Sequence, residues 1–384
     1  MGILGAVFGL STTIGPLVGG FMADNWTWRI SFYINIPLVC LSIISILLFV
    51  HPNTFSEKIA RVDFFGALML VTGLMLLLLG LNWGGRVYPW VSPVVIICIC
   101  VGLLLLCVFV FIEGKLALEP IIDPRILRHR NVALSILAEL CVGAVFFNTT
   151  FNLPVYYSFT QNSSASESGV RMVPLACGVV VSSIISGWLI AIFSAYRLAA
   201  CAGAVIMTLG AGLLCLFDGH ISTGAQVPIL ALLGSGIGCC IQALLLTAQA
   251  TVRSTDLAIT TALVTFSQML GGIMGLAFGS IHYLDILIDV NPKYATDIIK
   301  AQSNAKEQSI ISAYAKGFQY SFIMITCLAA VVIIFAACLQ AMSQHKPPPT
   351  PEPSPSPATS IITQPMRRGF DLNRMDHDEA TLAW

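Results

Sequence analysis

Charged side chains are scarce in this 384-residue chain, at 10% of the residues. A soluble domain carries about 25%. Hydrophobic residues make up 57% of the chain, and the mean hydropathy is +0.86. This small amount of polar surface cannot cover a soluble globule. Lipid must therefore be the solvent for much of the chain. The 19 basic and 19 acidic residues cancel, which argues against a basic face for nucleic acid.

Signatures of metal sites and of catalysis are also lacking. The twelve cysteines lie mostly inside apolar runs, and none stands in a CxxC pair or a Cys/His spacing typical of zinc. We interpret them as small packing residues. The six histidines fall in loops, helix ends or the tail and form no nucleophile or metal constellation. We therefore predict neither an enzyme nor a cofactor. Met1 leads into an apolar run without a basic region, which disfavours a signal peptide.

Long apolar runs are what the chain has instead. A run of about 20 apolar residues can cross the hydrocarbon core as a helix. Ten such runs are present, at 1–22, 30–50, 63–82, 92–112, 132–158, 169–193, 197–217, 226–250, 259–281 and 317–341. The sequence therefore predicts an all-α polytopic membrane protein with about ten transmembrane helices.

Basic residues in the short loops predict the orientation. With the N-terminus in the cytoplasm, eight lie in inside loops and three in outside loops. The inside set is Lys58, Arg61, Lys115, Arg125, Arg128, Arg130, Arg197 and Arg253, and the outside set is Arg29, Arg86 and Arg171. Cytoplasmic loops carry the excess of Lys and Arg, so both termini are predicted to be cytoplasmic.

Two segments stand apart from the spans. Residues 282–316 form a longer external loop whose periodicity predicts one or two solvent-exposed amphipathic helices. Residues 342–384 begin with the Pro-rich "HKPPPTPEPSPSP" and have no apolar periodicity, which predicts a disordered cytoplasmic tail. The sequon at Asn148 falls inside a span, so we expect it to carry no glycan.

Glycine is frequent within the spans. Small residues let a neighbouring helix backbone approach closely in a membrane. In the first span Gly15 and Gly19 lie one turn apart, and Pro16 allows a bend because it removes one backbone hydrogen bond. Such a helix can serve static packing, or it can be a hinge or seal between two bundles that rock against each other. The run "GSGIG" at 234–238 lies inside a span with no strand before it, so packing is preferred over a nucleotide loop.

The order of these residues resembles a known family. "GLSTTIGPLVGG" is similar to the antiporter motif on the fifth helix of the major facilitator superfamily, with Gly15, Pro16, Gly19 and Gly20 matching and Ser11 in place of a preferred glycine. "WTWRISFYINIP" then resembles the stretch into the sixth helix of fourteen-spanner drug:proton antiporters, especially fungal toxin and multidrug exporters. Further similarities follow in the family's order, among them "DFFGALML", "LNWGGRVYPW", "FNLPVYYSFTQNSSASESGVRMVPL" and "TALVTFSQMLGGIMG".

The resemblance covers residues 1–341 and implies a partial major facilitator fold. Residues 1–50 would be the last two helices of the N-terminal bundle, and 51–131 two linker helices with a cytoplasmic loop. Residues 132–341 would be the C-terminal six-helix bundle. The first four helices of the family would be absent, and with them motifs that carry gating and much of the proton coupling.

A few polar residues inside the spans are candidates for function. Glu139 is the one carboxylate clearly within a span, and a buried carboxyl group can take up and release a proton. It lies about two turns from the cytoplasmic end, so it can alternatively reach interfacial water. Gln249 and Gln268 match family positions and can either orient a substrate or bond across helices. For Gln242 and Asn152 we prefer packing. Arg171 matches a family position and can pair with a carboxylate at a gate or anchor the interface.

The resemblance implies proton-coupled efflux of small amphipathic compounds such as drugs, toxins or secondary metabolites, by alternating access. The expected partners are that substrate, a proton and the lipid bilayer, in the plasma membrane or alternatively the vacuolar membrane. The alternative is a truncated, non-transporting membrane protein: an incomplete gene model, a pseudo-transporter, or a sensor or subunit.

Overall fold

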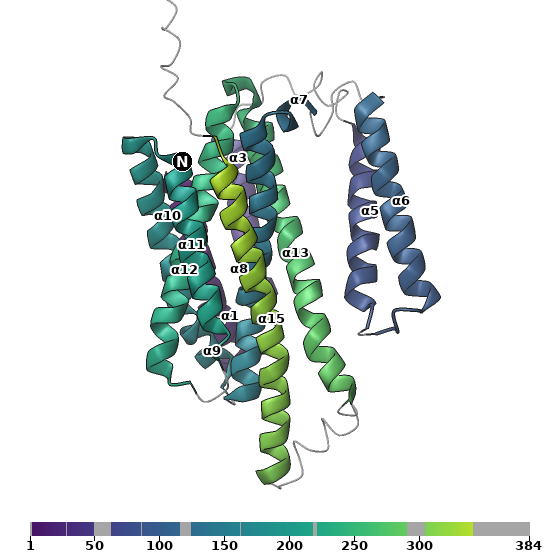
Figure 1. Ribbon diagram of the computed structural model, residues 1–384, viewed down its shortest axis with the longest axis vertical. Coiled ribbons are helices and arrows are strands. Elements are labelled where there is room, and N and C mark those ends of the chain that lie inside the picture. The colour runs from purple at the N-terminus through teal and green to yellow at the C-terminus, as the bar shows by residue number, and fades with distance from the viewer. Residues whose placement is uncertain are drawn as a thin grey trace, which may run out of the picture. The chain divides into compact units, whose positions relative to one another are not determined.

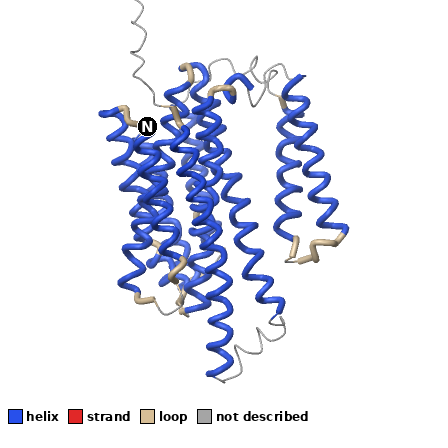
Figure 2. Tube along the Cα trace, viewed as in Figure 1, coloured by secondary structure: helices blue, strands red, loops and turns tan. Residues whose placement is uncertain are grey.

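The computed structural model describes residues 2–27, 29–49, 63–85, 87–115, 124–161, 163–217, 221–289 and 304–340. Within these ranges the chain is helical, and no strand forms beyond an isolated bridge between Gly84 and Tyr88. Figure 2 shows these helices in blue, with short tan loops between several of them. They are α1 Gly2–Asn25, α2 Ile30–Tyr33, α3 Asn35–Phe49, α5 Phe64–Trp83, α6 Pro93–Lys115, α7 Pro124–Leu127, α8 Arg130–Thr160, α9 Ala165–Arg171, α10 Val173–Phe193, α11 Tyr196–Leu214, α12 Thr223–Thr251, the 3₁₀ turn Ser254–Asp256, α13 Leu257–Asp289 and α15 Asn304–Cys338.

The helices confirm the prediction of an all-α polytopic membrane protein. In the described part of the chain, nine helical segments are long and apolar enough to cross a membrane, and each coincides with a predicted span. The remaining predicted span, 1–22, is helix α1, which runs through Pro16 without interruption. Large apolar side chains such as Leu47, Phe111 and Trp188 point outward, as expected of helices whose outer surface meets lipid.

Helices α8, α10, α11, α12 and α15 pack side by side around a common core, and α13 packs against α8 and α15 (Figure 1). Their largest fully buried side chains are aromatic. The Tyr156 ring lies 5.9 Å from the Phe217 ring and 5.6 Å from the Phe318 ring. Aromatic rings at such distances contribute beyond their buried area. This cluster joins α8 to α15 and to the end of α11.

Glycines set how closely these helices approach. Gly234 and Gly238 of α12 lie against the backbone carbonyls of Leu175 and Val179 in α10, and Gly236 lies against Met207 in α11. The run "GSGIG" is thus inside a helix and lets α12 fit between α10 and α11. This confirms the packing interpretation.

Helices α5 and α6 form a hairpin with its own glycine seam. Gly73 and Gly80 of α5 face Leu105 and Ile99 of α6. At the start of α5 the Asp63 carboxylate accepts the Gly66 N–H at 2.8 Å, which is a helix N-cap. At the tip, Trp83 and Tyr88 meet edge to face at 5.9 Å.

The predicted external loop begins later and ends earlier than expected. Helix α13 continues to Asp289 and α15 begins at Asn304, so both flanks of 282–316 extend the neighbouring spans. Residues 290–303 lie outside the described ranges. The tail 342–384 also lies outside them.

Candidate functional site

Helices α8 and α13 touch along their backbones. Gly143 of α8 lies against the carbonyl of Gln268, and Gly271 of α13 lies against the carbonyl of Leu140. A glycine at each contact leaves no Cβ to hold the helices apart. These contacts place Glu139 and Gln268 on facing turns of the two helices.

Glu139 is buried without a hydrogen-bond partner. Its side chain is 1% exposed, and neither carboxylate oxygen has a partner. One turn earlier on α8, the hydroxyl of Ser135 is also buried and unpartnered. An isolated buried carboxylate is costly, so such a group either binds a proton or takes a partner that is not always present.

Helix α13 contributes two further groups of the same kind. The side-chain nitrogen Nε2 of Gln268 and the hydroxyl of Thr260 are buried and have no partner. The two helices thus carry four buried polar side chains with an unpartnered atom: Ser135 and Glu139 on α8, and Thr260 and Gln268 on α13.

Glu139 lies within the membrane-spanning part of the bundle. Glu139 stands nine residues after the first residue of α8, which is about 14 Å of helix rise. The hydrocarbon core is about 30 Å thick. Since the side chain is almost fully covered, burial separates Glu139 from surface water in this conformation.

The other polar residues that the sequence singled out within spans have different surroundings. Gln249 donates from Nε2 to the Thr261 hydroxyl at 2.8 Å, which ties the end of α12 to the start of α13. Gln242 packs against Gly187 of α10. Asn152 is 7% exposed, and its Nδ2 has no partner.

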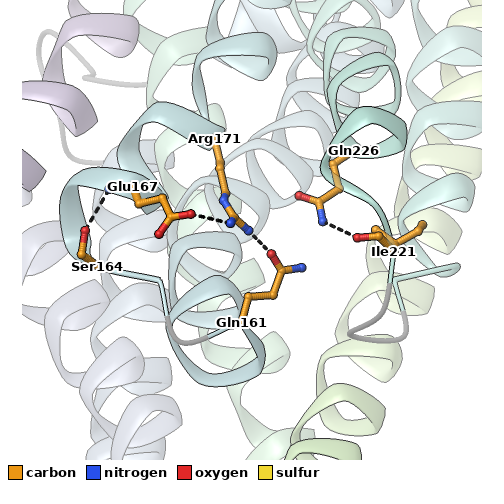
Figure 3. A network of polar contacts seen from close by, with 6 residues as sticks. All are labelled: Gln161, Ser164, Glu167, Arg171, Ile221 and Gln226. Atoms are coloured by element: carbon orange, nitrogen blue, oxygen red, sulfur yellow. Dashed lines mark hydrogen bonds and ion pairs between the residues drawn. The ribbon is translucent and has the colours of Figure 1, made fainter.

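Arg171 lies at the opposite end of α8, in the polar network of Figure 3. Its Nη2 donates to the Glu167 carboxylate at 2.6 Å and its Nη1 donates to the side-chain amide oxygen Oε1 of Gln161. Its guanidinium lies 5.3 Å from the centre of the Tyr157 ring. Tyr157 follows Glu139 by 18 residues of one helix, about 27 Å of rise. Arg171 and Glu139 therefore belong to different regions of the protein.

The glycines of the first span have unequal surroundings. A Cβ added at Gly15 or Gly19 would meet nothing within 4 Å, whereas one at Gly20 would lie 2.5 Å from the carbonyl oxygen of Ala165. Gly20 is thus the residue of this set at which α1 touches the C-terminal bundle. The side chain of Pro16 is not among those that the structure describes.

Asp24, at the end of α1, is a residue that the sequence did not single out. Its carboxylate accepts the backbone N–H groups of Ala165 at 3.3 Å and Ser166 at 2.7 Å. Ser166, through its hydroxyl and its backbone N–H, lowers the pKa of Asp24 below its ordinary value. No sequence signal indicated this pairing, because an acidic residue at a helix end is ordinary and its partners lie 141 and 142 residues away.

Parallel apolar spans, glycine-lined helix contacts and unpartnered polar groups at membrane depth define a polytopic membrane protein with an internal polar site. Residues 1–276 match the Major Facilitator Superfamily, and the chain belongs to that family.

Several fungal proteins are similar to it. The MFS-type efflux pump MFS1 of Arthroderma benhamiae is 30% identical over 295 residues, 75% of this chain and 55% of that protein. Efflux pump bfoC of Aspergillus brasiliensis is 34% identical over 71% of this chain and 49% of its own. Efflux pump roqT of Penicillium rubens is 28% identical over 90% and 68%. The chain spans about half to two thirds of the length of these relatives.

Among solved structures, a bacterial homologue of the human lysosomal transporter Spinster, in an inward-facing and occupied conformation, is 17% identical. It matches 88% of this chain and 84% of its own with a TM-score of 0.48.

Proposed function

We propose that this protein takes part in proton-coupled efflux of small amphipathic compounds, by alternating access, as a member of the fourteen-spanner drug:proton antiporter group. Membership of the Major Facilitator Superfamily and similarity to proteins named as efflux pumps support efflux. The observation that carries proton coupling is Glu139, a buried carboxyl group with no partner at membrane depth.

In this proposal Glu139 takes up and releases the proton. Gln268, with its unpartnered Nε2 on the facing helix, orients a hydrogen-bonding group of the substrate. Gln249 and Arg171 lie further away and support the ends of the bundle through Thr261 and Gln161. The glycine-rich helix α1, with Gly15, Pro16, Gly19 and Gly20, provides the seam along which two bundles move. The substrate class covers drugs, toxins and secondary metabolites, and both termini face the cytoplasm of a plasma or vacuolar membrane.

The experiment is efflux of a fluorescent amphipathic compound from cells that lack their own exporters, measured against external pH. Glu139→Gln keeps the shape of the side chain and removes its titration, so we expect efflux that no longer responds to pH and falls by about 10²-fold, in the range for loss of a proton-transferring group. Glu167→Gln, which alters an exposed carboxylate, is the control and should retain the pH response.

Unchanged pH-dependent export by Glu139→Gln would remove Glu139 from the proton pathway. If the wild-type chain, with insertion confirmed, exports nothing above empty membranes, the non-transporting alternative replaces the proposal for this 384-residue form.

A further inference from the structure

The contact between Asp24 and the start of helix α9 joins two parts of the chain that are far apart in sequence. Helix α9 is seven residues long and begins at Ala165. The first N–H groups of a helix have no partner within the helix. Here the Asp24 carboxylate accepts the N–H groups of Ala165 and Ser166, and the Ser164 hydroxyl accepts that of Glu167 at 3.2 Å. The N–H groups of the first turn of α9 thus find their acceptors partly in Ser164, just before the helix, and partly in Asp24 of α1.

The same turn of α9 lies against Gly20. A Cβ at Gly20 would come within 2.5 Å of the Ala165 carbonyl oxygen and 3.1 Å of the Ser166 Cα atom. Gly20 precedes Asp24 by four residues, so both lie on one face of α1. Close backbone approach at Gly20 brings the carboxylate of Asp24 within reach of the α9 amides.

The other end of α9 is fastened to α8. Arg171, the last residue of α9, donates to Gln161 at the end of α8 and lies over the Tyr157 ring. After Met172 the chain enters α10, which also packs on α1. Helix α9 therefore bridges α1 and α8, held by Asp24 at its first turn and by Arg171 at its last.

We propose that Asp24 is a positioning residue that latches α1 to the C-terminal bundle through α9, and that this latch opens each time the seam between α1 and the bundle opens. The proposal rests on the alternating-access function. Asp24 is exposed, so water can replace its carboxylate at the α9 amides when the helices separate. Such a contact is strong enough to favour the closed seam and weak enough to be released.

The test is hydrogen–deuterium exchange of the full chain, produced in bacteria and placed in lipid nanodiscs, followed in peptides that cover 163–170. Asp24→Ala should speed exchange at Ala165 and Ser166 about three- to tenfold, the effect of losing a helix cap. Asp24→Asn should give an intermediate rate, because its amide oxygen can still accept one N–H. Gly20→Ala should speed the same exchange, because the added Cβ meets the Ala165 backbone.

Two neighbouring variants are matched controls. Asn25→Ala removes a side chain that donates to Phe21 of its own helix, and Gly19→Ala adds a Cβ that meets nothing within 4 Å. Both should exchange as the wild type does. Equal rates in Asp24→Ala and Asn25→Ala, or in Gly20→Ala and Gly19→Ala, would overturn the latch. Efflux is measured separately. If the exchange pattern is as expected but no efflux occurs, the α1–α9 contact stands and the transport proposal falls. If efflux occurs but the exchange rates of variants and controls are equal, the transport proposal stands and the latch falls.

Discussion

Two carboxylates in this protein have opposite surroundings. Glu139 is enclosed by α8 and its neighbours and has no hydrogen-bond partner, whereas Asp24 is exposed and accepts two backbone N–H groups. The first arrangement favours a group that changes its protonation state, and the second favours a group that stays ionised. This contrast agrees with the proposals that Glu139 exchanges a proton and that Asp24 contacts the α9 amides as a charged carboxylate.

The contact made by Asp24 should depend on pH in one direction. Its folded pKa lies below the ordinary value of 3.8, because of Ser166. Protection of the α9 amides is then fully present above the unfolded pKa and is lost as the pH falls through the lower folded pKa. We expect the ratio of amide protection between wild type and Asp24→Ala to be constant from pH 7 to about pH 5 and to approach one in stronger acid.

Helix α9 itself carries two charged side chains, Glu167 in its first turn and Arg171 in its last. The measurement is therefore made in a Glu167→Gln background, so that one carboxylate titrates beside the helix. A ratio that rises as the pH falls would contradict the assignment.

Single residues were predictable where they broke an apolar pattern. Glu139, Gln249 and Gln268 stood out because polar groups are rare inside spans. Their different surroundings were not predictable, because the bond from Gln249 to Thr261 and the lack of a partner for Gln268 Nε2 depend on how α12 and α13 are placed. Asp24 did not stand out at all, since its role arises from a partner on another helix.

At the level of helices, the glycine contacts control how closely neighbours pack. Gly234→Ala should lower the free energy of unfolding by about 1–3 kcal/mol, because the new Cβ overlaps the Leu175 backbone in α10. Gly212→Ala is the control: its Cβ would meet Thr326 at 3.8 Å, an ordinary contact, so higher helix propensity should raise stability by up to about 1 kcal/mol. Thermal unfolding of both variants in one detergent measures the difference, and equal midpoints would contradict the glycine argument.

The helices themselves were predictable because apolar runs of bilayer length are strong signals. The periodicity of 282–316 also predicted helix there, but not that this helix continues the neighbouring spans. Helix α15 begins at Asn304, well before the apolar run, in a stretch whose Ala, Lys, Glu and Gln favour helix in water. Hydropathy detects the part of a helix that lies in lipid and gives no boundary for the part that continues beyond it. The same reason explains why α13 extends to Asp289.

For the molecule as a whole, the proposed transport cycle depends on the seam between α1 and the C-terminal bundle. Alternating access requires two bundles to move against each other around a site near the middle of the membrane. Here Glu139 and Gln268 supply the polar groups at depth, while α1 meets the bundle at α9 and α10. If the seam must open during transport, a covalent link across it will stop transport without altering the buried site.

Cysteines at Gly20 and Ser166 can form that link once the two helices move slightly apart, because a Cβ at Gly20 would lie 2.5 Å from the Ala165 carbonyl oxygen and 3.1 Å from the Ser166 Cα atom, whereas a disulfide needs Cβ atoms about 3.5–4.5 Å apart. In a chain with the other cysteines replaced, oxidation of Gly20→Cys/Ser166→Cys should abolish efflux and reduction should restore it. The matched control joins Gly80→Cys to the native Cys98, whose Cβ lies 3.2 Å from the added Cβ. That bond stays within the α5–α6 hairpin, whose two helices need not separate, so efflux should survive oxidation. Full efflux with the α1–α9 bond formed would mean that this seam stays closed throughout transport, and the moving interface would then have to lie elsewhere in the protein.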